Sequence, residues 1–330
     1  MTRLERALRA HEGPVVVAWV VLIIVFTVGS SHFLTISNID QVLVQSLFVV
    51  FVAIGMTFVL TVGGIDLSVG SVIGLGGAIT GLLLIHGVPA WLAVLGGLAA
   101  GGFTGLANGL LITRLGLADF IVTLATLSVV QGIVEVMTAN APINYPPHAL
   151  STLTSGHIGS VSTAVVYAVL IVIVMTGVYR FTPFGRAVVA VGMNPRAARL
   201  AGIGVETTRV RAYVVSGVLA GLAGVFLASY LSTVQALQGS GYELTAIAAA
   251  VIGGTSLRGG RGSVWGAALG ALLLSTLQNG LVLLGLNGYW FDLVTGGVIA
   301  LAVGLGGGLQ GIRWIGREKV ARPYQDGSPA

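Results

Sequence analysis

The chain has 330 residues, of which 55% are hydrophobic and only 8% charged, whereas a soluble domain carries about 25% charged residues. Composition therefore predicts a polytopic membrane protein, and membrane orientation explains the formal net charge of +5 better than nucleic-acid binding does. The absence of cysteine excludes disulfides, thiolate metal sites and cysteine nucleophiles.

Ten hydrophobic segments, each bounded by glycine, proline or charged residues, predict ten transmembrane helices. The segments cover residues 14–31, 41–62, 68–85, 90–113, 119–138, 161–179, 210–234, 244–256, 264–286 and 290–309. The predicted fold class is an all-α polytopic membrane protein. Its transmembrane domain, 14–309, lies between a cytoplasmic N-terminal segment, 1–13, and a cytoplasmic tail, 310–330.

Glycine makes up 50 of the 330 residues. Several glycines are four residues apart within one span, a spacing that lets two membrane helices approach closely. These sets are Gly97/Gly101/Gly105, Gly217/Gly221 and Gly266/Gly270.

All 16 lysine and arginine residues fall on one side of the membrane when the N-terminus is placed inside. They lie in the N-terminal segment, at Arg114, in the loop 180–211, at Arg258 and Arg261, and in the C-terminal tail. The loops at 32–40, 86–89, 139–160, 235–243 and 287–289 hold none. Because basic loops stay in the cytoplasm, the sequence predicts that both termini are cytoplasmic.

Residues 63–70, Gly-Gly-Ile-Asp-Leu-Ser-Val-Gly, interrupt the apolar sequence between the second and third spans. The paired glycines permit a turn there. Asp66 or Ser68 can accept hydrogen bonds from the free N–H groups of the first turn of the third span, so helix capping is the simplest interpretation. The alternative is that the broken helix belongs to a transport pathway or gate.

The loop 180–211 contains a short predicted helix with both a start and a stop signal. Its distinctive residues are Asn194, Pro195, Arg196, Arg199, Leu200 and Gly202. The asparagine is the predicted N-cap, the proline occupies the first turn and the glycine ends the helix. The two arginines lie one turn apart beside an apolar leucine. We expect this helix to dock another protein, and the alternative is an interfacial helix that lies on anionic lipid.

Two sequence elements recur in the second half of the chain with matching internal spacing. Residues 108–110 and 120 recur as 279–281 and 291, and residues 64–68 recur as 241–245. Because an odd number of spans separates the copies, they run in opposite directions through the bilayer. Such a 5+5 inverted-topology repeat is typical of transporters, and it places the pathway near the interface between the repeats.

The eighth predicted span, 244–256, is too short to cross the bilayer. Its ~13 residues, at ~1.5 Å each, cover ~20 Å of a ~30 Å hydrocarbon core. We expect Glu243 at the outer mouth of this span. The residues predicted to frame a pathway or gate are Asp66, Ser68, Glu243, Thr245, Asn108 and Asn279.

Polar side chains occur within or near the spans, at Gln45, Asn108, Gln131, Glu135, Gln278, Asn279 and Asp292. A charged group in hydrocarbon costs about 2.5 to 3.5 kcal/mol on insertion scales, so most of them should face the protein interior. We expect the amides to bridge helices rather than bind a solute. The histidines lack metal-ligand spacing, and the only lysine, Lys319, is not part of a G-x-x-x-x-G-K-[ST] P-loop, so the sequence predicts neither a metal site nor an ATP site in this chain.

Three motifs, in order along the chain, resemble the ribose/xylose-type permeases of bacterial ABC sugar importers, within the branched-chain amino-acid/ribose permease superfamily. They are GIDLSVGS at 64–71, AARLAGI at 197–203, and the series GYEL, IGGTS and GGRG within 241–262. The resemblance covers about residues 40–305. The chain departs from the family at Thr245, where Asp is usual, and at Pro195-Arg196, where small or acidic residues are common.

The resemblance implies a multi-pass permease in the bacterial cytoplasmic membrane that pairs with a second copy or a related permease. It also implies an ABC ATPase subunit docked on the short helix, and a periplasmic or lipid-anchored binding protein that delivers a pentose or hexose. ATP and Mg²⁺ would bind the ATPase, so this chain would hold no cofactor and would not itself be an enzyme.

Other functions remain open from the residues alone. A self-sufficient secondary transporter would need a coupling-ion site, and candidate carboxylates such as Glu135 and Asp292 are few and unpaired in sequence. A membrane enzyme would need a nucleophile, a base and a metal cluster that the sequence does not bring together. Importers of the same build for an autoinducer, a nucleoside or a branched-chain amino acid also fit.

Overall fold

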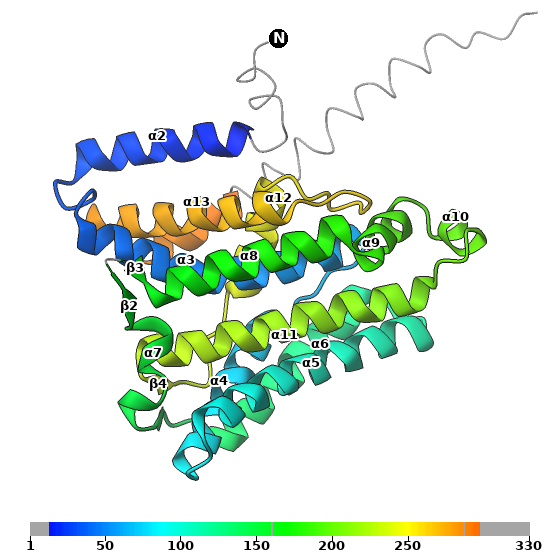
Figure 1. The fold of residues 1–330 in the computed structure, drawn as a ribbon, viewed down its shortest axis with the longest axis horizontal. Coiled ribbons are helices and arrows are strands. Elements are labelled where there is room, and N and C mark those ends of the chain that lie inside the picture. Colours follow the sequence, from blue (N-terminus) through cyan, green and yellow to red (C-terminus); the bar gives the residue numbers. More distant parts are fainter. Residues whose placement is uncertain (1–12, 160, 287, 298–330) are drawn as a thin grey trace, which may run out of the picture.

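The computed structural model describes residues 13–159, 161–286 and 288–297, and most of this part is helical (Figure 1). The longer helices are α2 (Gly13–Gly29), α3 (Ile36–Thr61), α4 (Val69–Ile85), α5 (Ala90–Arg114), α6 (Asp119–Thr138), α8 (Thr163–Phe181), α9 (Pro183–Met193), α11 (Val205–Leu231), α12 (Tyr242–Ile252) and α13 (Val264–Leu283). The short elements are β1 (Ile143–Asn144), η1 (Pro147–Ala149), α7 (Ser151–Thr154), β2 (His157–Ile158), β3 (Val161–Ser162), α10 (Pro195–Leu200) and β4 (Thr233–Val234). Residues 288–297 are also helical.

Each predicted span coincides with a helix, the tenth only as far as residue 297. Among the described helices, α3, α5, α6, α8, α11 and α13 are long and apolar enough to cross a membrane. Helices α2, α4 and α12 are apolar but shorter. The chain is therefore a multi-pass membrane protein. The predicted N-terminal segment, except its last residue, the end of the tenth span and the C-terminal tail lie outside the described residues.

Helix α3 forms the centre of the molecule. Its most apolar 18-residue stretch is 89% buried, and α8, α11, α12 and α13 pack around it. Phe51 and Ile54 on this helix are fully buried. A helix that is hydrophobic on all sides needs neighbours on all sides, so the uniform apolar sequence of α3 matches its central place.

Close backbone contact holds α5 and α11 together. A Cβ atom at Gly101 would overlap the carbonyl oxygen of Gly217, and one at Gly221 would lie 2.7 Å from the carbonyl oxygen of Gly97. Glycine at these positions lets the two backbones touch, and van der Waals contact of this kind drives helix association in a membrane. The close packing predicted from the glycine spacing is confirmed here.

The connections gather at two opposite ends of the helices (Figure 1). At one end β1 pairs with β4 and β2 pairs with β3, both antiparallel, so the predicted outer loop 139–160 is joined to the residues after α11. At the other end the N–H of Gly260 donates to the carbonyl oxygen of Thr61 at 2.8 Å, and Gly192 of α9 contacts the same carbonyl. The predicted inner loop 180–211 therefore lies beside the predicted inner turn at Gly259 and Gly260.

The predicted loop 180–211 is more helical than expected. Helix α9 was not predicted, because its glycines and valines have low helix propensity. It forms because Val188 and Val191 bury against the core, and the Thr182 side chain accepts a hydrogen bond at its start. Helix α11 begins at Val205, so Arg209 and Arg211 lie in a helix and not in the loop.

Candidate translocation pathway and docking helix

The connection between α3 and α4 is not helical and turns at Gly63, whose φ of +82° lies in the left-handed region. Asp66 within it is 1% exposed. Its Oδ1 accepts hydrogen bonds from the N–H of Ser68 at 3.0 Å and from the Ser68 hydroxyl at 2.6 Å. Its Oδ2 accepts from the hydroxyl of Ser216 in α11 at 2.9 Å. The carboxylate thus ties the break to α11.

Of the two predicted capping residues, Asp66 accepts an N–H at the first residue of the predicted third span, whereas the side chain of Ser68 does not cap the helix. Ser68 is the N-cap residue of α4, but its side chain makes no capping hydrogen bond. The hydroxyl donates to Asp66 instead, because a buried carboxylate is the strongest acceptor within its reach. Asp66 in turn binds the N–H of the cap residue and not an N–H of the first helical turn.

Asn108 belongs to the same cluster. Its Nδ2 donates to the Ser68 hydroxyl at 2.9 Å, and its Oδ1 accepts from the Thr126 hydroxyl at 2.6 Å. The structure therefore brings Asp66, Ser68 and Asn108 together. It adds Ser216 and Thr126, which no sequence signal indicated. This buried polar cluster links α4, α5, α6 and α11.

Glu243 is half-buried and lies beside Gly70 near the start of α4, far along that helix from the end predicted to be outside. Its Oε1 accepts from the N–H of Gly241 at 3.2 Å, and Thr245 donates to the Gly241 carbonyl at 3.1 Å. Its Oε2 is buried against Gly70 and has no hydrogen-bond partner among the described residues. Gly70 lies 15 residues, and so ~22 Å, along α4 from Ile85 at the end predicted to be outside.

The residues between α11 and α12 explain this position, because they fold back along α4. The predicted outer loop 235–243 is therefore a re-entrant segment. Glycines on one face of α4 leave room for this segment. Gly81 lies against Val234, Gly74 against Ala236, and Gly70 against Gly239. Helix α12 starts within the protein, and its 11 residues cover only ~17 Å.

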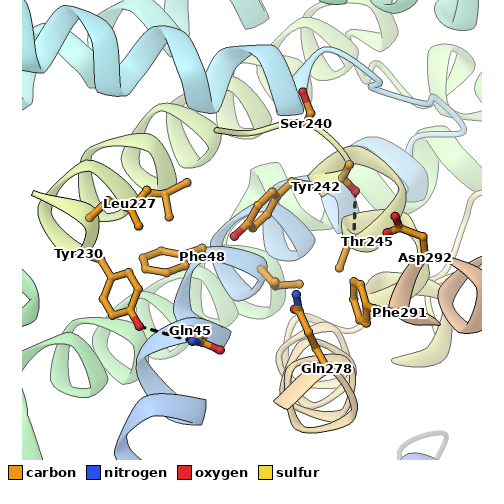
Figure 2. A pocket seen from close by; sticks show the side chains of 13 residues that line it. Gln45, Phe48, Leu227, Tyr230, Ser240, Tyr242, Thr245, Gln278, Phe291 and Asp292 are labelled. Atoms are coloured by element: carbon orange, nitrogen blue, oxygen red, sulfur yellow. Dashed lines mark hydrogen bonds between the residues drawn. The ribbon is translucent and has the colours of Figure 1, made fainter. Parts of the chain in front are cut away.

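A cavity of about 350 Å³ lies between α3, α11, α12, α13 and the helix at 288–297 (Figure 2). Its polar lining consists of Gln45, Ser240, Thr245, Gln278 and Asp292. Its aromatic lining consists of Phe48, Tyr230, Tyr242 and Phe291. Figure 2 shows side chains from separate helices converging on this space, with the Gln45 amide 3.4 Å from the Tyr230 hydroxyl.

The cavity suits a neutral solute that carries hydroxyl groups. Amide, hydroxyl and carboxylate groups supply both donors and acceptors for hydroxyls, and aromatic rings cover the apolar faces of a small ring. None of the described residues that line the cavity is basic. An anionic group there would lose its hydration without gaining a cation.

Asn279 follows Gln278 in sequence but serves a different purpose. Its Nδ2 donates to Oδ1 of Asn38 at 2.9 Å, and Nδ2 of Asn38 donates back to Oδ1 of Asn279 at 3.0 Å. This pair joins α13 to α3 and does not line the cavity. The expectation that amides bridge helices is confirmed for Asn279, Asn108 and Gln45, which bonds Tyr230 of α11 and also lines the cavity. Gln278 faces the cavity, and Gln131 bonds Glu135 of its own helix.

The short helix α10 forms as its sequence signals predict. The Asn194 side chain accepts hydrogen bonds from the N–H groups of Arg196 and Ala197 at 3.0 and 3.1 Å. Pro195 is the first helical residue, and Gly202 has a φ of +79° just after the end.

Two apolar side chains are exposed at this end of the protein. Leu200, the last residue of α10, is 91% exposed, and Met193, the last residue of α9, is 73% exposed. Arg199 forms an exposed ion pair with Glu206 at the start of α11. Figure 1 shows α10 at the tip of the molecule, at the end opposite the short strands.

Residues 38–303 match a family of proteins described as "Branched-chain amino acid transport system / permease component". The chain belongs to this permease family. Its members include the ribose/xylose-type permeases that the motifs resemble. No solved structure matches the chain.

Several relatives match this permease along most of their length. RbsC of Bacillus subtilis (strain 168), a ribose import permease protein, is 40% identical over 86% of this chain and 88% of its own. AlsC of Escherichia coli (strain K12), a D-allose transport system permease protein, is 36% identical over 87% and 89%. LsrC of Yersinia pseudotuberculosis serotype O:1b (strain IP 31758), an autoinducer 2 import system permease protein, is 33% identical over 88% and 82%.

Proposed function

We propose that this permease is the membrane-spanning subunit of an ATP-binding-cassette importer that moves a pentose or hexose across the bacterial cytoplasmic membrane. The observation that carries the proposal is the 40% identity to a ribose import permease along 86% of the chain. The cavity beside Gln278 supports the same class of solute, because its lining offers hydroxyl partners and no basic group.

The importer requires partners that this chain does not supply. A separate ATPase subunit binds ATP and Mg²⁺ and performs the hydrolysis. A periplasmic or lipid-anchored binding protein delivers the sugar, and a second copy of the permease, or a related permease, completes the membrane part. Selection of the sugar is then shared between the binding protein and the permease.

The ATPase docks on α10. A capped helix with an exposed leucine offers an apolar contact, and the short connection from α10 to α11 couples its movement to the membrane domain. The residues of this site are Asn194, Pro195, Arg196, Arg199, Leu200 and Gly202.

Ten spans in two inverted halves also fit the packing. In such a repeat α3 corresponds to α11, α4 to α12 and α5 to α13. The repeat therefore predicts that the α5–α11 contact has a counterpart between α13 and α3, and that the α4–α11 contact has one between α12 and α3. All four pairs of helices are in contact. The basic residues of the described loops share the end that carries α10, which supports cytoplasmic termini.

The pathway runs past the cavity and the re-entrant segment. The gate is framed by two sets of residues. One set is Glu243 and Thr245 at the start of α12, and the other is the cluster of Asp66, Ser68 and Asn108 at the start of α4. The unpartnered oxygen of Glu243 supports a gating role, because a buried carboxylate oxygen that lacks a partner in one state gains stability from a state that supplies one. Asn279 holds α13 beside α3 next to this path.

Reconstitution tests the proposed function. Proteoliposomes that contain the permease, its ATPase and its binding protein should take up sugar only when ATP is supplied to the ATPase. Uptake driven by an ion gradient without ATP would favour a self-sufficient secondary transporter. A thermal-shift screen of the binding protein against pentoses, hexoses, nucleosides, branched-chain amino acids and autoinducer 2 would then identify the solute, since a ligand stabilises the protein that binds it.

A further inference from the structure

A second cavity, of about 550 Å³, opens between α5, α9 and α11 at the end of the molecule that carries the basic loops. Its wall is apolar over most of its length and includes Leu106, Leu110 and Val214. Arg114, the last residue of α5, and Arg211, in the second turn of α11, also line it. Apolar walls therefore end at two guanidinium groups.

The two arginines are not neutralised by the protein. Among the described residues, neither Arg114 nor Arg211 forms an ion pair, and both are exposed. The one carboxylate that lines the groove, Glu206, pairs with Arg199. The groove thus presents two positive charges without a counter-ion.

The position of these charges along the membrane normal matches a lipid headgroup. Helix α11 has 27 residues and is ~40 Å long, so it exceeds the ~30 Å hydrocarbon core and reaches the headgroup region. Arg211 lies six residues, or ~9 Å, from the start of α11. Val214 and Leu106 lie farther toward the middle of their helices, where acyl chains are.

We propose that this groove binds one anionic phospholipid. Its phosphate lies between Arg114 and Arg211, and an acyl chain follows the apolar wall along Leu110, Leu106 and Val214. A soluble anion would leave that wall unfilled, and a zwitterionic lipid would bring its own cation to the arginines. Because α11 begins shortly after α10, a lipid held here also steadies the base of the proposed docking helix.

The test compares lipids on the whole permease purified in detergent. Phosphatidylglycerol and phosphatidylcholine with the same acyl chains are added in turn, and bound lipid is counted by native mass spectrometry. We expect one phosphatidylglycerol per chain, bound roughly tenfold to thirtyfold more weakly by Arg114→Gln/Arg211→Gln. Phosphatidylcholine should bind weakly to both proteins. Each single arginine variant should show a smaller loss, which keeps the test valid if the double variant fails to fold.

Matched variants separate this site from general attraction to a basic surface. Arg180→Gln/Arg261→Gln removes two exposed charges outside the groove and should bind phosphatidylglycerol as the wild type does. Leu106→Trp should fill the apolar wall and weaken lipid binding while both arginines remain. Equal losses in the two double variants, equal binding of the two lipids, or displacement of the lipid by inorganic phosphate or by the ATPase subunit would each overturn the proposal.

Discussion

Asp66 is a buried carboxylate that accepts hydrogen bonds from the Ser68 N–H and from the hydroxyls of Ser68 and Ser216, and no basic side chain of the described part of the chain bonds to it. Hydrogen bonds to a charged acceptor are worth about 1.5–3 kcal/mol, and a buried donor left without a partner costs about 1–3 kcal/mol. Individual residues in this permease therefore matter most where several donors depend on one acceptor.

We expect Asp66→Asn to retain most transport and Asp66→Ala to lose it. The asparagine keeps one acceptor for Ser68, and the Ser216 hydroxyl can rotate to accept from the new amide. The alanine leaves at least two buried donors unpaired, a loss of about 2 to 5 kcal/mol that thermal unfolding in detergent would show. If the asparagine variant transports no better than the alanine variant at equal protein level, the charge itself is required and the hydrogen-bond explanation is wrong.

Gln278 provides a test of the cavity. Gln278→Leu keeps the size of the side chain and removes its donors and acceptor, so sugar uptake should fall about tenfold for one lost hydrogen bond to the solute. Thermal stability should change little. The control is Gln131→Leu on α6, whose amide bonds to Glu135 and lies outside the cavity. Equal loss of uptake in both variants would count against a solute site here.

The α5–α11 pair and helix α10 are stabilised in different ways. The α5–α11 pair is stabilised by direct backbone contact, which requires glycine at the crossing. Helix α10 depends on its caps, because a helix of six residues has too few internal hydrogen bonds to be stable alone. The first element resists substitution inside the membrane, and the second presents a surface to a partner.

Gly101→Ala should destabilise the permease by about 1–3 kcal/mol, because its Cβ would overlap the backbone of Gly217. Gly177→Ala is the matched control. That glycine is also in a helix, but a Cβ there meets no atom within 4 Å, so the change should be neutral or stabilising by up to about 1 kcal/mol. Thermal unfolding of the two purified variants gives the comparison, and similar midpoints would show that the crossing has room.

Leu200→Asp should abolish co-purification of the ATPase and ATP-driven uptake while the permease still reaches the membrane. The substitution places a charge in the proposed apolar contact, and the exposed position of Leu200 means that folding should not suffer. Leu115→Asp, in the turn after α5, changes a side chain that is also exposed and should leave ATPase binding intact. Retained ATPase binding in the Leu200→Asp protein would exclude α10 as the docking site.

The whole molecule is organised by its two ends. Short strands join the loops at one end, and basic residues with α9 and α10 occupy the other (Figure 1). In the proposed importer, this separation leaves one face for the binding protein and the opposite face for the ATPase, and α3 is the central helix of the membrane domain.

Introduced cysteines test the orientation, since the chain has none of its own. Ser155→Cys, between α7 and β2, should react with an impermeant thiol reagent added to the periplasmic side. Ala201→Cys, after α10, should react only when the membrane is opened. Both positions are exposed, so access depends on the side of the membrane and not on burial. The reverse pattern would invert the topology and place the docking helix on the wrong side.

Sequence by itself determined the membrane class, the position of the spans, the short helix after Asn194 and the family, because hydropathy, charge placement and caps act over a few neighbouring residues. Only the tertiary structure decided how these parts meet. It joined Asp66 to Ser216 across 150 residues, turned the predicted outer loop 235–243 inward along the glycines of α4, and placed Gln278 in the cavity but Asn279 against Asn38. These outcomes depend on which backbones can approach and which buried polar groups can find partners, and both are properties of pairs of helices that no single segment of sequence contains.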